Sequence, residues 1–307
     1  MLTRRSLAEL FVDRLLELDR FRRSLAGTSG RRIIRVTGGP GMGKSWLLRA
    51  FASEATARQV PNVLLDFSDG QAYDVLTLIR RCRDALGPEH FNPLTVAINE
   101  ATAPRLVITA PSRTAPGPLV DLSGSQLGDL QLGDVAGGTI IKDNSFVFQS
   151  ENPLLLQAIE DRLTQVFFAC LAPLAATSGA LLLFDSYERT SQDHDRWVSN
   201  AADRWIQSEL LSRVSSGQLP GTLVVLAGRR LPTFDISWNP VVGELVLGQF
   251  TLDDVRDYLR ENRGLSDLSD AEIQTLFNAV QGNPQLLGII GDNLEQTRVG
   301  READDDW

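Results

Sequence analysis

The eight residues GGPGMGKS, at positions 38–45, restrict the local fold more than any other part of the sequence. They follow the β-branched run RIIRVTG (32–38) and precede a helical pattern over 44–58. Glycine adopts backbone conformations that are closed to other residues, so the stretch predicts a tight loop between a strand and a helix. Its spacing is G-x-x-x-x-G-K-[ST], in which backbone N–H groups turn inward and form a cradle for phosphate oxygens.

Lys44 is one of two lysines in a chain that otherwise uses arginine for positive charge. A compact ammonium on a flexible stem reaches the β- and γ-phosphates of a nucleotide in a cramped loop, where a planar guanidinium does not. The positive end of the following helix adds to this attraction, and Ser45 offers a hydroxyl ligand to Mg²⁺. The residues expected to bind the nucleotide here are Gly38, Gly39, Pro40, Gly41, Met42, Gly43, Lys44, Ser45 and Trp46.

A second stretch, LLLFDSYER (181–189), places carboxylates after an apolar run. Asp185 is expected at the carboxyl end of a strand, where it holds Mg²⁺ through water. Glu188 follows three residues later and is expected to polarise the attacking water in catalysis. The alternative is that Asp185 only ends the strand and that Glu188 is a solvated loop residue.

The third stretch, LVVLAGRR (223–230), ends in two arginines. If this strand lies between the strand before the glycine-rich loop and the strand that ends at Asp185, an arginine emerges near the γ-phosphate. A guanidinium there senses whether the third phosphate is present, and Arg229 is the preferred residue for this role. The alternative is that Arg229 and Arg230 face solvent or pair with surface carboxylates. Together with Glu188 and Lys44, Arg229 completes the expected catalytic set.

Short apolar runs alternate with helical patterns through most of the chain. Four of the runs are nearly continuous in apolar residues, as is typical of parallel strands covered on both faces. The alternation predicts an α/β fold with a doubly wound parallel sheet and ligands at the carboxyl ends of the strands. The expected strands are 32–38, 62–68, 180–186, 222–228 and 244–248, and the helical patterns are 44–58, 72–86, 152–176 and 198–216.

From residue 249 onward the sequence predicts three helices and no strand. Thr251 can cap the first helix, and Ser269 with Glu272 forms a capping box for the second. Asn283 can cap the third, with Pro284 in the tolerated first-turn position. We therefore expect a small helical subdomain over 249–307.

Residues 111–150 fit neither pattern, because they combine prolines with repeated Leu-Gly-Asp segments. The alternation of apolar residues with Gly-Asp predicts short strands and tight turns. A flexible surface insertion is one interpretation, and a pairing surface for another subunit is the other.

The formal net charge of −9 argues against a nucleic-acid partner, which needs a basic surface. The apolar runs are far shorter than the roughly 20 residues of a membrane span. Charges interrupt the first apolar residues, so no signal peptide is expected. Cys82, Cys170, His90 and His194 provide neither a disulfide framework nor a zinc cluster. A reducing, cytoplasmic setting is expected.

These motifs together resemble the STAND class of P-loop NTPases, relatives of NACHT and apoptotic-ATPase regulators and, more distantly, of AAA+ proteins. LFDSYER is similar to the extended Walker B of that class, and LAGRR to its sensor strand. The segment LFVDRLLELDRF (10–21) is similar to the N-terminal motif that lies against adenine. The resemblance assigns adenine-side contacts to Phe11, Val12 and Arg14, although Asp13 stands where glycine is commoner.

The segment GNPQLL is similar to the Gly-x-Pro motif of this class, and the resemblance implies that Pro284 packs against the nucleotide. The fold implied is a P-loop NTPase core of the ASCE type with five core strands and a C-terminal helical lid. The implied domains are an N-terminal helix and adenine-side segment (1–30), the NTPase core with its insertion (31–248), and the lid with an acidic tail (249–307).

The resemblance implies a molecular switch with ATP or ADP and Mg²⁺ as ligands and slow ATP hydrolysis. In this class ADP holds the lid closed, and ATP opens it and exposes surfaces for homo-oligomerisation in bacterial signalling or defence. Sensor or effector proteins are then expected on separate chains. Two alternatives stay open: a nucleotide-binding scaffold without useful turnover, and an AAA+-like loader acting on nucleic acid, against which the acidic charge weighs.

Overall fold

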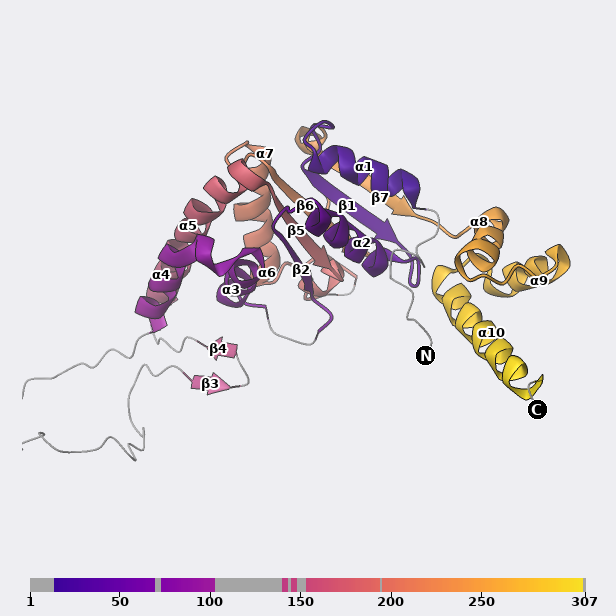
Figure 1. Ribbon diagram of the computed structural model, residues 1–307. Helices are drawn as coiled ribbons and strands as arrows, with labels where there is room; N and C mark the ends of the chain where they lie inside the picture. Colours follow the sequence, from indigo (N-terminus) through magenta and orange to yellow (C-terminus); the bar gives the residue numbers. More distant parts are fainter. Residues whose placement is uncertain are drawn as a thin grey trace, which may run out of the picture.

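The computed structural model describes residues 14–69, 73–102, 140–142, 145–147, 153–193 and 195–305. Within these residues, five strands form an all-parallel sheet in the order β2-β5-β6-β1-β7 (Figure 1). Numbered along the core, this is the order 2-3-4-1-5, so the predicted α/β fold class is confirmed. The strands are β1 (Ile33–Gly38), β2 (Asn62–Asp66), β5 (Ala180–Asp185), β6 (Thr222–Gly228) and β7 (Val242–Leu247).

The central strands are buried on both faces, as their apolar runs predict. Every residue of β5 and of β6 is buried. Helices α1 and α2 cover one face of the sheet, and the other helices that precede the lid cover the opposite face (Figure 1). The covering helices are α1 (Leu15–Leu25), α2 (Lys44–Ala57), α3 (Val75–Leu86), α4 (Asn92–Thr102), α5 (Pro153–Ser178), α6 (Ala201–Trp205) and α7 (Ser212–Ser215).

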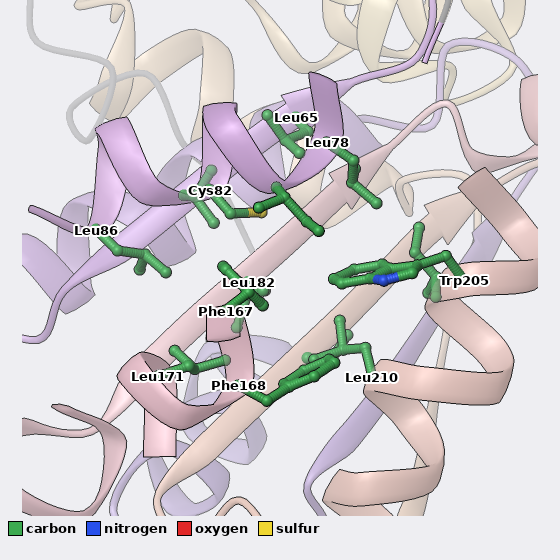
Figure 2. Packing of buried hydrophobic residues seen from close by; sticks show 14 of the residues in the cluster. Leu65, Leu78, Cys82, Leu86, Phe167, Phe168, Leu171, Leu182, Trp205 and Leu210 are labelled. Carbon is green, nitrogen blue, oxygen red and sulfur yellow. The ribbon is translucent and has the colours of Figure 1, made fainter. Parts of the chain in front are cut away.

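Alternate residues of each strand serve the two cores. On β5, Leu182 packs with the cluster under α3 and α5, whereas Leu183 packs with the cluster under α2. Figure 2 shows the larger cluster, in which Leu182 lies among Cys82, Phe167 and Trp205. This period of two is the strand geometry that allows one apolar run to join two helical layers.

The C-terminal helices form a separate cluster beyond the β7 edge of the sheet (Figure 1). Thr251 caps α8 (Leu252–Asp257), which continues into the π-helical turn η5 (Tyr258–Asn262). Ser269 and Glu272 form the expected capping box on α9 (Asp270–Val280). The third helix is α10 (Pro284–Asp305). Residues 249–305 thus contain the three predicted helices, with a small core of their own.

Some elements differ from the sequence expectation. The helix expected over 198–216 consists of α6, the π-helical turn η3 (Ile206–Leu211) and α7 in succession. The short helix η1 (Pro88–Phe91) and α4 were not predicted. Within the 111–150 segment, β3 (Ile140–Lys142) pairs antiparallel with β4 (Ser145–Val147), and the Leu-Gly-Asp repeat lies outside the described residues. No described helix combines the length and apolar character that a membrane span requires.

The central position of β5 gives a stability prediction. We expect Leu182→Ala to lower the free energy of unfolding by about 3 kcal/mol, because it leaves a cavity between the sheet and α5. Val246 on β7 is 69% exposed, so Val246→Ala should change this free energy by less than about 0.5 kcal/mol. Urea denaturation of both variants measures the difference, and equal effects would contradict the assigned core.

Candidate nucleotide-binding site

The glycine-rich loop joins β1 to α2 in the conformation that its sequence requires. Gly41 has φ 73° and Gly43 has φ 84°, values that strain any other residue. A side chain at Gly38 would bring its Cβ to 2.9 Å from the carbonyl oxygen of Leu247 on β7. The helix starts at Lys44, so its first N–H groups face the loop. This is the strand–loop–helix context that the motif predicts, and a side chain at these glycines would disturb the cradle.

Lys44 lies over the loop and among the other charged residues predicted for the site. Its Nζ donates to the carbonyl oxygens of Gly38, at 2.7 Å, and of Gly39, at 2.8 Å. Partial burial lowers the pKa of the Lys44 ammonium, and the nearby charges of Glu188, Arg229 and Asp185 act on it as well. The structure therefore brings the three predicted catalytic residues and Asp185 to one end of the sheet.

Asp185 ends β5 in a buried position beside the loop. Its side chain is 4% exposed, and it accepts hydrogen bonds from the Ser45 hydroxyl and, at 2.8 Å, from the Ser186 backbone N–H. Burial raises the pKa of the Asp185 carboxyl, the two hydrogen bonds oppose this rise, and the charges of Asp66 and Glu188 add to it. A hydroxyl and a carboxylate in contact form a donor set that suits Mg²⁺, a hard cation that prefers oxygen ligands.

Asp66 is a neighbour of this site that the sequence analysis did not select. It ends β2 and is the register partner of Asp185 across the two parallel strands. One of its carboxylate oxygens accepts from the backbone N–H of Ser68 at 2.9 Å. The signal available in the sequence was that both aspartates end an apolar run, but strand order was needed to pair them.

Glu188 and Arg229 are in direct contact. The Arg229 backbone N–H donates to Glu188 Oε2 at 3.0 Å, and its guanidinium Nε lies 3.7 Å from Oε1. The Arg229 side chain is 64% exposed, whereas Glu188 is 23% exposed. Gly228 allows this approach, because a Cβ there would come within 2.7 Å of Glu188 Oε2. Strand β6 lies between β1 and β5, as the sensor-arginine hypothesis requires.

Arg230 points to a different place from Arg229. Its Nη2 donates to the carbonyl oxygen of Asp193 at 2.5 Å and to the Ser191 hydroxyl at 3.2 Å. Its guanidinium lies over the Trp197 ring, 5.4 Å from the centroid. Arg230 therefore holds the segment that follows Glu188, and Arg229 is the arginine beside the loop end of the sheet.

The first turn of α10 lies directly on the glycine-rich loop. The Gln285 backbone N–H donates to the Gly41 carbonyl oxygen at 3.2 Å. The amide oxygen of Asn283 would be 2.8 Å, and that of Gln285 2.9 Å, from a Cβ on Gly41. Pro284 lies between these two residues and begins the helix. The Gly-x-Pro segment and the glycine-rich loop are thus in direct contact, although they lie far apart in the sequence.

Arg14 connects the N-terminal segment to the residues that lead into the C-terminal helices. Its Nη2 donates to the Gly248 carbonyl oxygen at 2.8 Å, and its guanidinium lies 5.2 Å from the centroid of the Phe250 ring. Phe250 in turn donates its backbone N–H to Gly282 at 2.8 Å. Phe11 and Val12, the other predicted adenine-side residues, lie outside the described residues.

Three of the residues expected to bind the nucleotide, Pro40, Met42 and Trp46, occupy different environments around the start of α2. Met42 is buried against the sheet, whereas Pro40 is exposed. Trp46 is 43% exposed although it lies in the first turn of the helix. Its indole is therefore available for contact with a ligand or with another surface.

Comparisons with known proteins show similarity to solved structures but not to characterised sequences. No protein-family profile matches the chain, and no curated protein matches its sequence. The fold is similar to that of a STAND protein, a signal transduction ATPase with numerous domains, which has a tetratricopeptide repeat sensor and comes from Pyrococcus horikoshii. The identity is 11% and the TM-score is 0.44. The match covers 88% of this chain and 29% of the Pyrococcus chain, so this chain spans under a third of that protein.

The environment of Asp185 predicts how the protein responds to pH. Because the folded state raises the pKa of this carboxyl, ionising it above the ordinary aspartate range costs folding free energy. Asp185→Asn should therefore raise the free energy of unfolding near pH 7.5 in nucleotide-free protein. The gain should shrink as the pH falls toward about 4, where the carboxyl is protonated in the unfolded chain as well.

Chemical denaturation at several pH values measures this difference. The exposed Asp161 on α5 offers a matched control, since Asp161→Asn removes a charge outside the site. A gain at Asp185 that did not shrink by about pH 4, or one equal to that of the control at every pH, would count against a burial penalty.

Proposed function

We propose that the chain is a nucleotide-dependent molecular switch of the STAND class, which binds ATP or ADP with Mg²⁺ and hydrolyses ATP slowly. The observation that carries the proposal is the contact between the lid and the phosphate loop, from Gln285 N–H to Gly41 O. A lid that rests on the loop responds to what the loop holds.

The switch works through a difference in affinity between lid positions. ADP, which ends at the β-phosphate, is compatible with Asn283 and Gln285 lying against Gly41. The γ-phosphate of ATP adds charge and volume beside the same loop and favours a displaced lid. A ligand shifts such an equilibrium only by its differential affinity for the two states. Displacement exposes the lid and loop surfaces, and we infer that a homo-oligomer or a partner protein on a separate chain uses them.

Each site residue has a role in this proposal. The backbone N–H groups of 38–44, which Pro40 lacks, bind the phosphates, and Lys44 neutralises their charge. Ser45 and Asp185 would hold Mg²⁺, which would supply positive charge to the phosphates. Glu188 orients and polarises the attacking water, and Arg229 senses the γ-phosphate. Adenine-side contacts fall to the segment that begins with Phe11 and Val12 and ends at Arg14, and to Pro284 of the lid.

The second candidate is a scaffold that holds a nucleotide as a structural ligand. The observation that favours it is that Arg229 already contacts both carboxylate oxygens of Glu188. Its Oε2 accepts from Arg229 N–H and its other oxygen faces the Arg229 guanidinium. If this arrangement persists with ATP bound, the carboxylate is not free to polarise water. Glu188→Gln then leaves turnover unchanged, whereas the switch hypothesis predicts a loss of about a hundredfold or more.

Lys44→Ala tests nucleotide binding itself. We expect the ADP dissociation constant from calorimetry to rise by about a hundredfold, because the phosphate charge loses a partly buried partner. Lys142, the other lysine, serves as the control. Equal affinities for the wild type and for Lys44→Ala would exclude this loop as the nucleotide site.

Asn283→Ala tests the lid contact. The variant loses the α10 cap, in which Asn283 accepts from the Gln285 and Leu286 N–H groups, together with its contact at Gly41. We expect ADP affinity to fall by about threefold to tenfold as the closed lid becomes less stable. Ser269→Ala loses a comparable cap on α9, away from the loop, and should leave affinity within about twofold. The same loss in both variants would mean general lid destabilisation.

Particle mass tests the switch as a whole. Light scattering should show a larger assembly with a non-hydrolysable ATP analogue than with ADP, because only the analogue displaces the lid. Identical masses with both nucleotides, together with tight binding of each, would favour the scaffold.

A further inference from the structure

The buried carboxylate of Asp203 binds side chains of the segment that follows Asp185. Asp203 on α6 is fully buried, and its Oδ1 accepts from the Tyr187 hydroxyl at 2.6 Å. Its Oδ2 accepts from Trp197 Nε1 at 2.9 Å and from Gln207 Nε2 at 2.7 Å. Three donors converge on one carboxylate, so both of its oxygens act as acceptors, which only the ionised form does fully.

Tyr187 is the residue directly before Glu188. It opens the short helical turn η2 (Tyr187–Thr190), which the chain enters through Ser186 in the left-handed region with φ 54°. Burial raises the pKa of the Tyr187 phenol well above its ordinary value, and the Asp203 charge adds to this. The phenol therefore stays protonated and keeps donating to Asp203 at every physiological pH.

The same turn is fixed from several other sides. The Tyr187 ring stacks on that of Trp197, with centroids 6.0 Å apart and planes 9° from parallel. The Thr190 hydroxyl donates to the Tyr187 carbonyl oxygen at 2.8 Å, and Asn200 donates its backbone N–H to Thr190 at 3.0 Å. Asp203 is the charged centre of this arrangement, because it binds residues on both sides of the 188–196 segment.

We propose that Asp203 is a positioning residue for Glu188: it holds Tyr187, and thereby the turn that directs the Glu188 carboxylate toward Arg229 and the phosphate loop. This inference rests on the proposed function for its catalytic consequence, but the position of Glu188 can be measured without nucleotide. Asp203 itself is buried under Tyr187 and Trp197 and does not touch the loop. It acts only through the residues that it binds.

The proposal explains why a charge is buried at this place. A buried carboxylate is costly unless donors satisfy it, and a neutral, apolar core residue would pack here without that cost. An apolar side chain would leave the buried Tyr187 hydroxyl and the partly buried Trp197 and Gln207 donors without this acceptor, and would not specify one orientation of the turn. A satisfied polar network instead fixes a single arrangement, which a water-activating carboxylate requires.

Asp203→Asn tests the proposal with little change in volume. The amide carries no charge and its nitrogen donates instead of accepting, so the charge-assisted bonds are lost and the Tyr187 hydroxyl is held only by a weaker hydrogen bond, as an acceptor. The Arg229 backbone N–H donates to Glu188 Oε2, so its hydrogen exchange reports the position of Glu188 in nucleotide-free protein. We expect exchange at the Arg229 amide to become about tenfold faster in Asp203→Asn.

Thr164→Val is the matched control. It removes a buried hydrogen bond, 2.9 Å long, from Trp205 Nε1 on α6 to Thr164 Oγ1 on α5. Trp205 shares α6 with Asp203, but this bond involves no residue of the Tyr187–Thr190 turn. It should lower stability without faster exchange at Arg229. Tyr187→Phe removes only the hydroxyl that binds Asp203 and should show a smaller acceleration; it provides the test if Asp203→Asn does not fold.

A double-mutant cycle gives the catalytic readout. If Asp203 acts through Glu188, Asp203→Asn lowers ATP turnover by about tenfold to a hundredfold in the wild-type background. In the Glu188→Gln background it should have little further effect. ADP affinity should be unchanged in both backgrounds, since Asp203 does not contact the loop.

The outcomes separate this inference from the proposed function. Unchanged exchange at Arg229 in both Asp203→Asn and Tyr187→Phe overturns it, as does an equal loss of turnover with and without Glu188. A wild-type protein that binds nucleotide without hydrolysis fails the proposed function, while the exchange measurement still decides whether Asp203 positions Glu188.

Discussion

The parallel register of β1, β6 and β5 is the constraint on which the site depends. Ile33 pairs with Val224, and Val224 pairs with Leu182, so the three strands end at one edge of the sheet. That edge then carries Gly38, Asp185 and the residues after Gly228. A one-residue slip of β5 or β6 would exchange the side chains that face the two cores and disrupt the packing of both. The two cores therefore fix the register that brings the site residues to one edge.

Burial acts on the pKa values of the charged residues at this edge, and hydrogen bonds also act on that of Asp185. Burial disfavours the ionised forms of both Lys44 and Asp185, since it lowers the pKa of the first and raises that of the second. The protein thus holds two groups that an ionic ligand would favour: under the proposed function, phosphate would compensate the ammonium and a divalent cation the carboxylate. A site that is unfavourable when empty and satisfied when filled couples binding to stability, which is useful for a switch.

The sequence predicted those features that depend on local pattern. The continuous apolar runs of β5 and β6 identified buried strands, and the glycine spacing identified the loop. Pairings between distant residues could not be read in this way. The contact of Asn283 with Gly41 depends on where the lid packs, and the role of Asp203 depends on the fold of the 186–200 segment. A polar residue in a helical pattern normally faces solvent, so Asp203 gave no signal.

Nucleotide-dependent protection of the Gln285 amide tests the central claim most directly. This N–H is shared between the Gly41 carbonyl oxygen of the loop, at 3.2 Å, and Asn283 Oδ1 of its own helix cap, at 3.0 Å, so the difference between nucleotides, and not the protection itself, reports the loop contact. The account predicts that ADP slows hydrogen exchange both at the loop amides of 38–44 and at Gln285. A non-hydrolysable ATP analogue should protect the loop but leave Gln285 exchanging faster than with ADP. If both nucleotides protect Gln285 equally, or if neither protects the loop, the account of a lid governed by the phosphate loop is wrong.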